Sequence, residues 1–319
     1  MRKRTSLILL TTLLLLLIVL PVLVTQLIGT GTRHLHGVSL KDVDYQEVIF
    51  HNLQQDLKLG GMLFVPEGQG PFPAVVIIQG SGTSQRDNPW YLTLTDYLQK
   101  NGIVVLVPDK RGSEQSEGDW HIASFEDLAT DTLAAISFLK KQEQVPISSI
   151  GIVGMSQGGY FAPLVATESS DIDFLVDVVG ASVPIYDLIL YEENHNLRQM
   201  GFLPGLSRLI SYGSTFYLKN VGQRDFWKAV GNFDPIPYWE KVTIPALVLY
   251  GQEDTNVPAT ESAARLRSLE KPNIEVIIYE GSGHALEDPE GKGDRIFRED
   301  ALKKIRDFIF SVTSPPQRT

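Results

Sequence analysis

The sequence predicts an α/β fold, in which a mostly parallel central sheet is covered by helices on both faces and carries a helical insertion. Two observations predict it. Short apolar runs such as Ala74–Ile78 and Ile103–Val107 are typical of strands that are buried on both faces. Segments with helical periodicity separate these runs, and strands that alternate with helices form parallel sheets.

The remaining elements follow from the same patterns. Further strands are predicted at Val43–Phe50 and Leu57–Val65, which can form a hairpin, and at Ile150–Val153, Phe174–Val179, Ala246–Tyr250 and Ile274–Tyr279. Helices are predicted at Trp90–Asn101, from Ser124, from Gln157 and at Ile296–Ser311. Ser124 begins the sequence Ser-Phe-Glu-Asp, which resembles a capping box.

A stretch without strand character separates the last two strands from the others. Residues 183–243 are rich in aromatic side chains, and we predict that they form a helical lid. The lid is expected to be part of a single domain that covers residues 33–319. The aromatic residues can line an apolar pocket or form the core of the lid itself, and the second interpretation is favoured for most of them.

Composition excludes several classes of protein. The chain has 28 Lys and Arg against 38 Asp and Glu, and this net charge of −10 argues against a nucleic-acid partner. It has no cysteine, so disulfides, thiolate metal sites and cysteine nucleophiles are excluded. No metal cluster or phosphate-binding loop stands out, and no cofactor is implied.

The first 32 residues differ from the rest. The run Thr5–Ile28 carries no charge and follows the basic residues Arg2, Lys3 and Arg4. At 1.5 Å per residue it reaches about 36 Å, enough to cross a bilayer. We therefore expect a signal anchor that places the following domain outside the cytoplasm, and a cleaved secretory signal is the alternative.

The sequence Gly154-Met155-Ser156-Gln157-Gly158 is the main candidate for chemistry. It fits G-x-S-x-G and lies between a predicted strand and a predicted helix, which is the setting of a nucleophile elbow. The helix directs its N-terminal amides and the positive end of its dipole at Ser156. Ser156 is therefore predicted to be a nucleophile.

A serine nucleophile needs a base, and the base needs an acid that orients it. His284 follows the last predicted strand, and Asp254 follows the strand before it, with Glu253 as the adjacent competitor. His34, His36 and His195 are expected to be surface or packing residues. Because the carboxyl ends of parallel strands share one edge of the sheet, Ser156, Asp254 and His284 are predicted to converge.

The order serine, aspartate, histidine resembles that of the α/β-hydrolase superfamily, on its esterase and serine-peptidase side, over roughly residues 43–312. The resemblance implies that the loop Gln79-Gly80-Ser81-Gly82 helps to form an oxyanion hole, although Gln79 stands where a histidine is common. It implies that the backbone N–H groups of Ser81 and Gln157 hold the oxyanion.

A second segment resembles a motif of the same superfamily. The sequence from Asp109 to Gly118 is similar to D-x-R-G-x-G-x-S, with Glu114 in place of the second glycine. Asp109 and Arg111 are predicted to be mainly structural, and no chemistry is assigned to Arg86 and Asp87.

The predicted function is a serine hydrolase that cleaves carboxylic esters of small, apolar acyl groups through an acyl-enzyme intermediate. A peptidase that cleaves short peptides from one end is the main enzymatic alternative, and a thioesterase is another. A membrane-tethered binding protein that keeps the fold without the chemistry is the alternative from a different class. The oligomeric state is not predicted.

Overall fold

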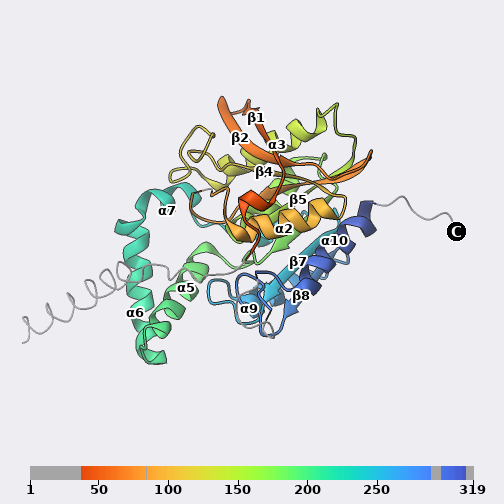
Figure 1. Cartoon of the computed structure of the whole chain (residues 1–319). Coiled ribbons are helices and arrows are strands. Elements are labelled where there is room, and N and C mark those ends of the chain that lie inside the picture. The colour runs from red at the N-terminus through yellow and green to blue at the C-terminus, as the bar shows by residue number, and fades with distance from the viewer. Residues whose placement is uncertain (1–36, 84, 289–295, 314–319) are drawn as a thin grey trace, which may run out of the picture.

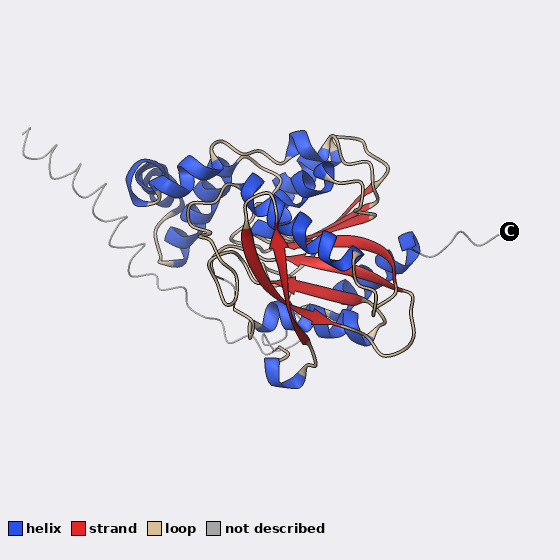
Figure 2. Ribbon diagram, turned by 90° about the horizontal axis from the view of Figure 1, so that it is seen from above, coloured by secondary structure: helices blue, strands red, loops and turns tan. Residues whose placement is uncertain are grey.

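The computed structural model describes residues 37–83, 85–288 and 296–313, and its centre is one eight-stranded sheet (Figures 1 and 2). The strands are β1 (Gln46–Asn52), β2 (Leu57–Phe64), β3 (Phe72–Ile78), β4 (Val104–Pro108), β5 (Ile147–Met155), β6 (Phe174–Val178), β7 (Ala246–Gly251) and β8 (Ile274–Tyr279). Their order in the sheet is β1-β2-β4-β3-β5-β6-β7-β8. β1 and β2 pair antiparallel as the predicted hairpin, β2 is antiparallel to β4, and the other strands are parallel.

Helices cover both faces of this sheet, as the apolar strands predict (Figure 2). The helices are α2 (Pro89–Lys100), α3 (Phe125–Lys140), α4 (Gln157–Glu168), α9 (Ala259–Arg267) and α10 (Glu299–Thr313), and a 3₁₀ turn, η1 (Leu40–Asp42), precedes β1. α2 and α10 pack on one face, while α3, α4 and α9 pack on the other. The central strands are therefore buried on both faces.

The element boundaries differ from the predictions where pairing or packing overrides local pattern. β5 begins three residues before the predicted start because Ile147 and Ser149 pair with Phe72 and Pro73 of β3. α10 begins at Glu299 rather than Ile296, since Ile296 and Phe297 are buried in the loop before it. The capping box at Ser124 is confirmed, with reciprocal bonds between Ser124 and Asp127.

Between β6 and β7 the structure contains helices and connecting loops in place of strands. They are α5 (Ile185–Gln199), α6 (Pro204–Tyr217), the π-helical turn η2 (Leu218–Gly222), α7 (Arg224–Val230) and α8 (Ile236–Trp239). α5 and α6 form a pair that projects from the sheet, with α6 on the outer side of α5 (Figure 1). This is the stretch for which a helical lid is predicted.

The predicted membrane segment, residues 5–28, lies outside the described residues. Among the described helices, none combines the length and the hydrophobicity that are needed to cross a membrane.

Candidate active site

Ser156 lies at the turn between β5 and α4. Its backbone has φ 54° and ψ −119°, a conformation that an L-residue rarely adopts, and its amide donates to Val178 O over 2.9 Å. The flanking glycines are required by close packing, because a Cβ on Gly158 would overlap the carbonyl oxygen of Ile78. The sharp turn holds the Ser156 side chain above the edge of the sheet, as in a nucleophile elbow.

His284 lies beside Ser156, in the loop that follows β8. Its Nε2 is 2.9 Å from Ser156 Oγ, and its Nδ1 is 2.7 Å from Asp254 Oδ2. Asp254 follows β7 and is buried, and its other oxygen accepts hydrogen bonds from the amides of Asn256 and Val257 at 2.8 and 2.9 Å. The carboxylate is therefore fixed by the backbone and directed at the imidazole.

Two opposing effects act on the pKa of His284. Burial lowers it, whereas the charge of Asp254 and the hydrogen bond to it raise it, and the raising effects prevail. Glu192, on α5, adds to the rise. An imidazole with a raised pKa is a stronger base, which suits a group that takes a proton from a hydroxyl.

The loop after β3 approaches Ser156 from the other side. A Cβ on Gly80 would stand 3.2 Å from Ser156 Cβ, and the Gly80 amide donates to Tyr91 Oη over 2.8 Å. Ser81 and Gln157 both line the pocket that contains Ser156. Gln157 is the first residue of α4, so its N–H lacks an acceptor in the preceding turn of the helix. Both predicted oxyanion residues thus lie next to the predicted nucleophile.

Lys110 is a component of this region that sequence reasoning missed. Its ammonium donates to Gly80 O and to Gln157 Oε1, the latter over 3.3 Å, and lies 5.5 Å from the centroid of the Trp120 ring. Burial lowers the pKa of Lys110 to about 7. Its place in the D-x-R-G segment could have marked it, but only the fold shows that its amine joins the Gly80 loop to α4.

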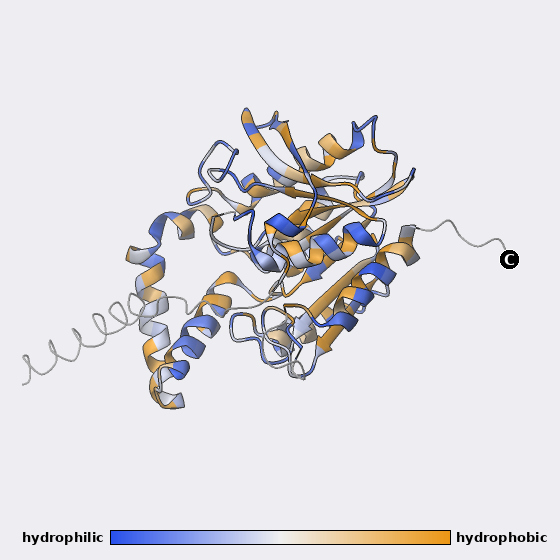
Figure 3. Ribbon diagram, viewed as in Figure 1, coloured by the Kyte–Doolittle hydropathy of each residue, from blue (hydrophilic) through white to orange (hydrophobic). Residues whose placement is uncertain are grey.

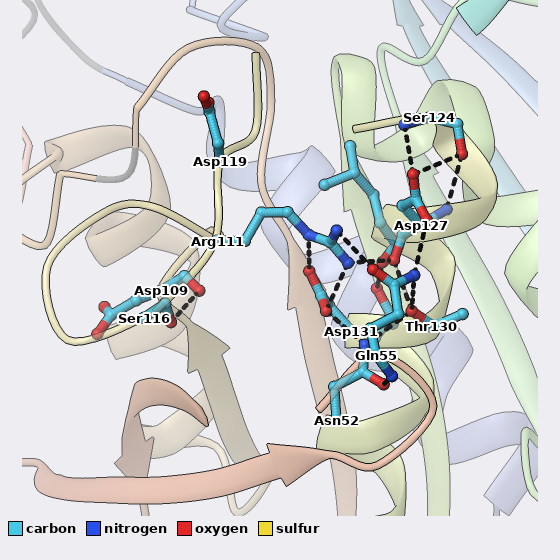
Figure 4. Close-up of polar contacts among 12 residues, drawn as sticks. Asn52, Gln55, Asp109, Arg111, Ser116, Asp119, Ser124, Asp127, Thr130 and Asp131 are labelled. Carbon is cyan, nitrogen blue, oxygen red and sulfur yellow. Dashed lines mark hydrogen bonds and ion pairs between the residues drawn. The ribbon is translucent and has the colours of Figure 1, made fainter. Parts of the chain in front are cut away.

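Two residues next to Lys110, Asp109 and Arg111, form ion pairs with other parts of the domain. Arg111 forms a bidentate pair with Asp131 at 2.7 and 2.9 Å and donates to Gln55 Oε1 at 2.8 Å (Figure 4). Arg86 forms a second bidentate pair with the buried Asp109, at 2.9 and 2.7 Å. These contacts agree with the structural role that is predicted for Asp109 and Arg111.

A pocket of about 600 Å³ opens above Ser156. Its lining includes the apolar side chains of Trp120, Ile122, Phe125, Tyr160, Leu188 and Phe226. Among the aromatic residues of segment 183–243, Phe226 is the one that lines this pocket within the described part of the chain; Trp227, Phe233 and Trp239 instead belong to the core. These three residues pack into the core of the sheet domain rather than into a core of the lid itself, while Tyr212 and Phe216 are exposed.

Two carboxylates that the sequence did not single out, Glu192 and Asp225, line the pocket. Glu192 lines it from α5, and burial raises the pKa of this carboxyl, as do the nearby charges of Glu193 and Asp254. No local pattern distinguishes Glu192 from Glu193, because the difference arises from which side of α5 faces the pocket. His195, on the same helix, contacts Tyr191 O at 3.0 Å.

The chain has the α/β-hydrolase fold. It resembles the esterase Pf2001 of Pyrococcus furiosus with a TM-score of 0.61 and 19% identity, covering 88% of this chain and 99% of that one. It also resembles the α/β hydrolase GrgF of Penicillium sp. sh18 with a TM-score of 0.63 and 18% identity, covering 86% and 100%. The predicted fold class is confirmed.

Within that class, the model of the prolyl oligopeptidase family matches residues 89–308, and the chain belongs to this family. It is 24% identical to esterase EstD of Thermotoga maritima over 248 residues, which are 73% of this chain and 59% of EstD. It is 28% identical to the uncharacterized peptidase YtmA of Bacillus subtilis over 253 residues, which are 77% of this chain and 88% of YtmA. The chain therefore combines the α/β-hydrolase fold with membership of the prolyl oligopeptidase family, and it spans about three fifths of the length of EstD.

Proposed function

We propose that this chain hydrolyses carboxylic esters through an acyl-enzyme intermediate on Ser156. The observation that carries the proposal is the continuous hydrogen-bonded path from Ser156 Oγ through the His284 ring to Asp254, with distances of 2.9 and 2.7 Å. This geometry lets a hydroxyl lose its proton as it attacks a carbonyl carbon.

In the first step, Ser156 Oγ forms a bond to the acyl carbon while its proton moves to His284 Nε2. The imidazolium is stabilised by Asp254, which stays ionised. His284 then returns the proton to the alcohol oxygen as the ester C–O bond breaks. Water repeats the sequence on the acyl enzyme, so that a carboxylic acid leaves and Ser156 regains its proton.

The negative charge that develops on the carbonyl oxygen needs donors. The Ser81 and Gln157 amides are assigned this role because both residues line the pocket beside Ser156, and the start of α4 adds its positive dipole end. About half of the residues that line the pocket are apolar, among them Ile122, Leu188 and Phe226, and this part of the lining favours a small apolar acyl or aryl group as the substrate.

Labelling with a fluorophosphonate probe tests the nucleophile. The wild-type chain is expected to take up one probe, and Ser156→Ala is expected to take up none and to lose hydrolysis by up to about 10⁶-fold. The exposed Ser170, replaced by Ala, is the matched control and should label fully. Folded wild-type protein that does not react would exclude this mechanism and favour a binding protein.

Glu192 favours a second candidate, a peptidase that acts at the N-terminus of short peptides. Glu192 lines the pocket, and burial raises the pKa of its carboxyl. A cationic group bound beside it would stabilise the ionised carboxylate, so Glu192 is a suitable acceptor for an ammonium group. The α-amino group of a peptide is such a cation, and the same nucleophile and base can cleave an amide.

Comparison of p-nitrophenyl esters with aminoacyl arylamides separates the two candidates. The ester proposal expects ester kcat/KM to exceed amide kcat/KM. It expects Glu192→Gln to leave the KM for neutral esters nearly unchanged and to move the acid limb of the pH profile to lower pH, because Glu192 helps to raise the pKa of His284. The peptidase requires amide turnover that rivals ester turnover and that Glu192→Gln lowers by about 10-fold or more, mainly through KM. The second pattern would overturn the preference for esters.

A further inference from the structure

The exposed apolar residues of the described structure gather in one segment. Ten large hydrophobic side chains are exposed among the described residues, and seven of them lie between positions 200 and 221: Met200, Leu203, Leu206, Leu209, Tyr212, Phe216 and Val221. We call these seven residues the α6 patch. Leu203, Leu209 and Phe216 are 74%, 61% and 66% exposed. Contiguous apolar surface of this kind marks an interaction site.

The polar and apolar sides of α6 are reversed relative to those of an ordinary surface helix. Its buried side is mostly small and polar, with Ser207, Ser211, Ser214 and Thr215 turned inward together with Ile210. Ser207 Oγ donates to Asn194 Oδ1 of α5 over 2.8 Å, while the large apolar residues face outward. Figure 3 shows hydrophobic residues along α6 at the outer edge of the molecule. A helix in water normally has the opposite arrangement.

The charges within segment 194–224, which Glu193 and Asp225 flank, have a single sign. Residues 194–224 include Arg198, Arg208, Lys219 and Arg224 and no Asp or Glu, in a chain whose net charge is −10. Arg198, Arg208 and Arg224 are exposed. Apolar and aromatic side chains next to exposed basic ones are the composition of helices that lie in the interface of anionic membranes.

We propose that the α6 patch lies on the surface of an anionic lipid bilayer, with α6 in the plane of the headgroups. The sequence predicts a membrane anchor at Thr5–Ile28, and such an anchor would hold the same chain at a bilayer. Neither argument depends on the chemistry at Ser156.

A second copy of the chain is the other occupant to consider. A symmetric contact through the patch would bring the basic residues of two copies together, including Arg208 of each, with no acidic residue of segment 194–224 to offset them. An anionic lipid surface supplies the opposite charge, so the lipid is favoured.

The α6 patch is continuous with the lining of the pocket. Val221 belongs to the patch and also lines the pocket above Ser156, next to Arg224 and Phe226. A bilayer against α6 would therefore lie beside the pocket wall that is formed by residues 221–226. An acyl compound that partitions into lipid would be concentrated at this wall.

The absence of cysteine allows a direct test. The full chain carrying Leu209→Cys, labelled with an environment-sensitive fluorophore, is reconstituted into vesicles of phosphatidylcholine and phosphatidylglycerol. Lys303→Cys, at an exposed position of α10, is the matched control. The label at 209 should shift its emission to the blue and be quenched by lipids that carry a nitroxide about 5–10 Å below the headgroups, and the label at 303 should not.

Equal quenching at the two positions would overturn the proposal. A blue shift at 209 that vanishes when the protein is diluted with lipid would overturn it too, because loss of the shift on dilution indicates contact with a second copy of the chain. A triple variant, Leu206→Gln with Phe216→Gln and Met200→Gln, carrying the label at 209, should lose most of the lipid quenching. Its circular dichroism should be unchanged, because all three side chains are exposed. Full quenching in the triple variant would also contradict the proposal.

Discussion

At the scale of single residues, the site combines two groups whose pKa values are displaced in opposite directions. The charge of Asp254 raises the pKa of His284 above its ordinary 6.5, in spite of burial, whereas burial lowers the pKa of Lys110 to about 7. His284 must be neutral to accept a proton. We expect Lys110 to act in its charged form, which binds Gly80 O and Gln157 Oε1 and so positions the two segments that are assigned to the oxyanion hole.

These displacements predict a bell-shaped dependence of ester kcat/KM on pH. Activity should rise with pH as His284 loses its proton, and it should fall above about 7 as Lys110 loses its charge. Lys110→Met should remove the alkaline limb and keep the acid limb. It should also lower kcat/KM by about 10-fold, less than the roughly 10²–10³-fold loss that follows removal of a direct oxyanion donor.

Initial rates from pH 5 to 9 with an ester substrate measure both limbs. If Lys110→Met kept the alkaline limb and changed only the unfolding free energy, Lys110 would be a structural residue alone. The thermal midpoint of the variant serves as the control for folding.

The candidate site was predictable at this scale only in part. Ser156, Asp254 and His284 each follow a strand, so their convergence could be expected from the chain order of the strands. Lys110 and Glu192 could not be identified in this way. Their roles depend on which side of a loop or helix meets the pocket, and that is decided by packing between segments that are far apart in the sequence.

At the scale of secondary structure elements, the close contact of α4 with β3 positions the nucleophile. Gly158→Ala would bring a methyl group against Ile78 O, which is backbone and cannot move aside cheaply. We expect this change to lower the unfolding free energy by about 1–3 kcal/mol and to reduce activity by displacing Ser156.

Gly205→Ala is the matched control, since a Cβ at this position of α6 meets no atom within 4 Å. It should leave stability unchanged or raise it slightly. Urea unfolding of the two variants measures the difference. A Gly158→Ala protein that is as stable and as active as the control would show that the tight turn is not required.

The presence of each strand and helix was easier to predict than the residues at which it begins and ends. The buried runs of β3, β4 and β7 are visible in the sequence because strands covered on both faces are apolar throughout. The apolar run of β8 is visible too, although this strand lies at the edge of the sheet and its residues are only half-buried or exposed. The extra residues of β5 are not, since Ser148 and Ser149 become strand residues only by pairing next to β3. The reversed orientation of α6 is likewise visible only once its contact with α5 is known.

At the scale of the whole molecule, the parallel sheet brings the three residues of the proposed catalytic triad together from distant parts of the chain. Ser156 and His284 are 128 positions apart in the sequence, and Asp254 and His284 are 30 apart, yet both pairs are within hydrogen-bonding distance. The parallel strands end at one edge, and short loops carry the three side chains to the same point. The insertion between β6 and β7 adds a wall of the pocket and the exposed α6 patch.

The most direct test of the central claim is to trap the covalent intermediate. A p-nitrophenyl carbamate leaves a carbamoyl enzyme that water releases slowly, so the adduct can be located by mass spectrometry of digested peptides. The account predicts release of one p-nitrophenolate per chain and one carbamoyl group on Ser156, with neither in Ser156→Ala. Carbamoylation of a different residue, or stoichiometric release of p-nitrophenolate that persists in Ser156→Ala, would contradict it.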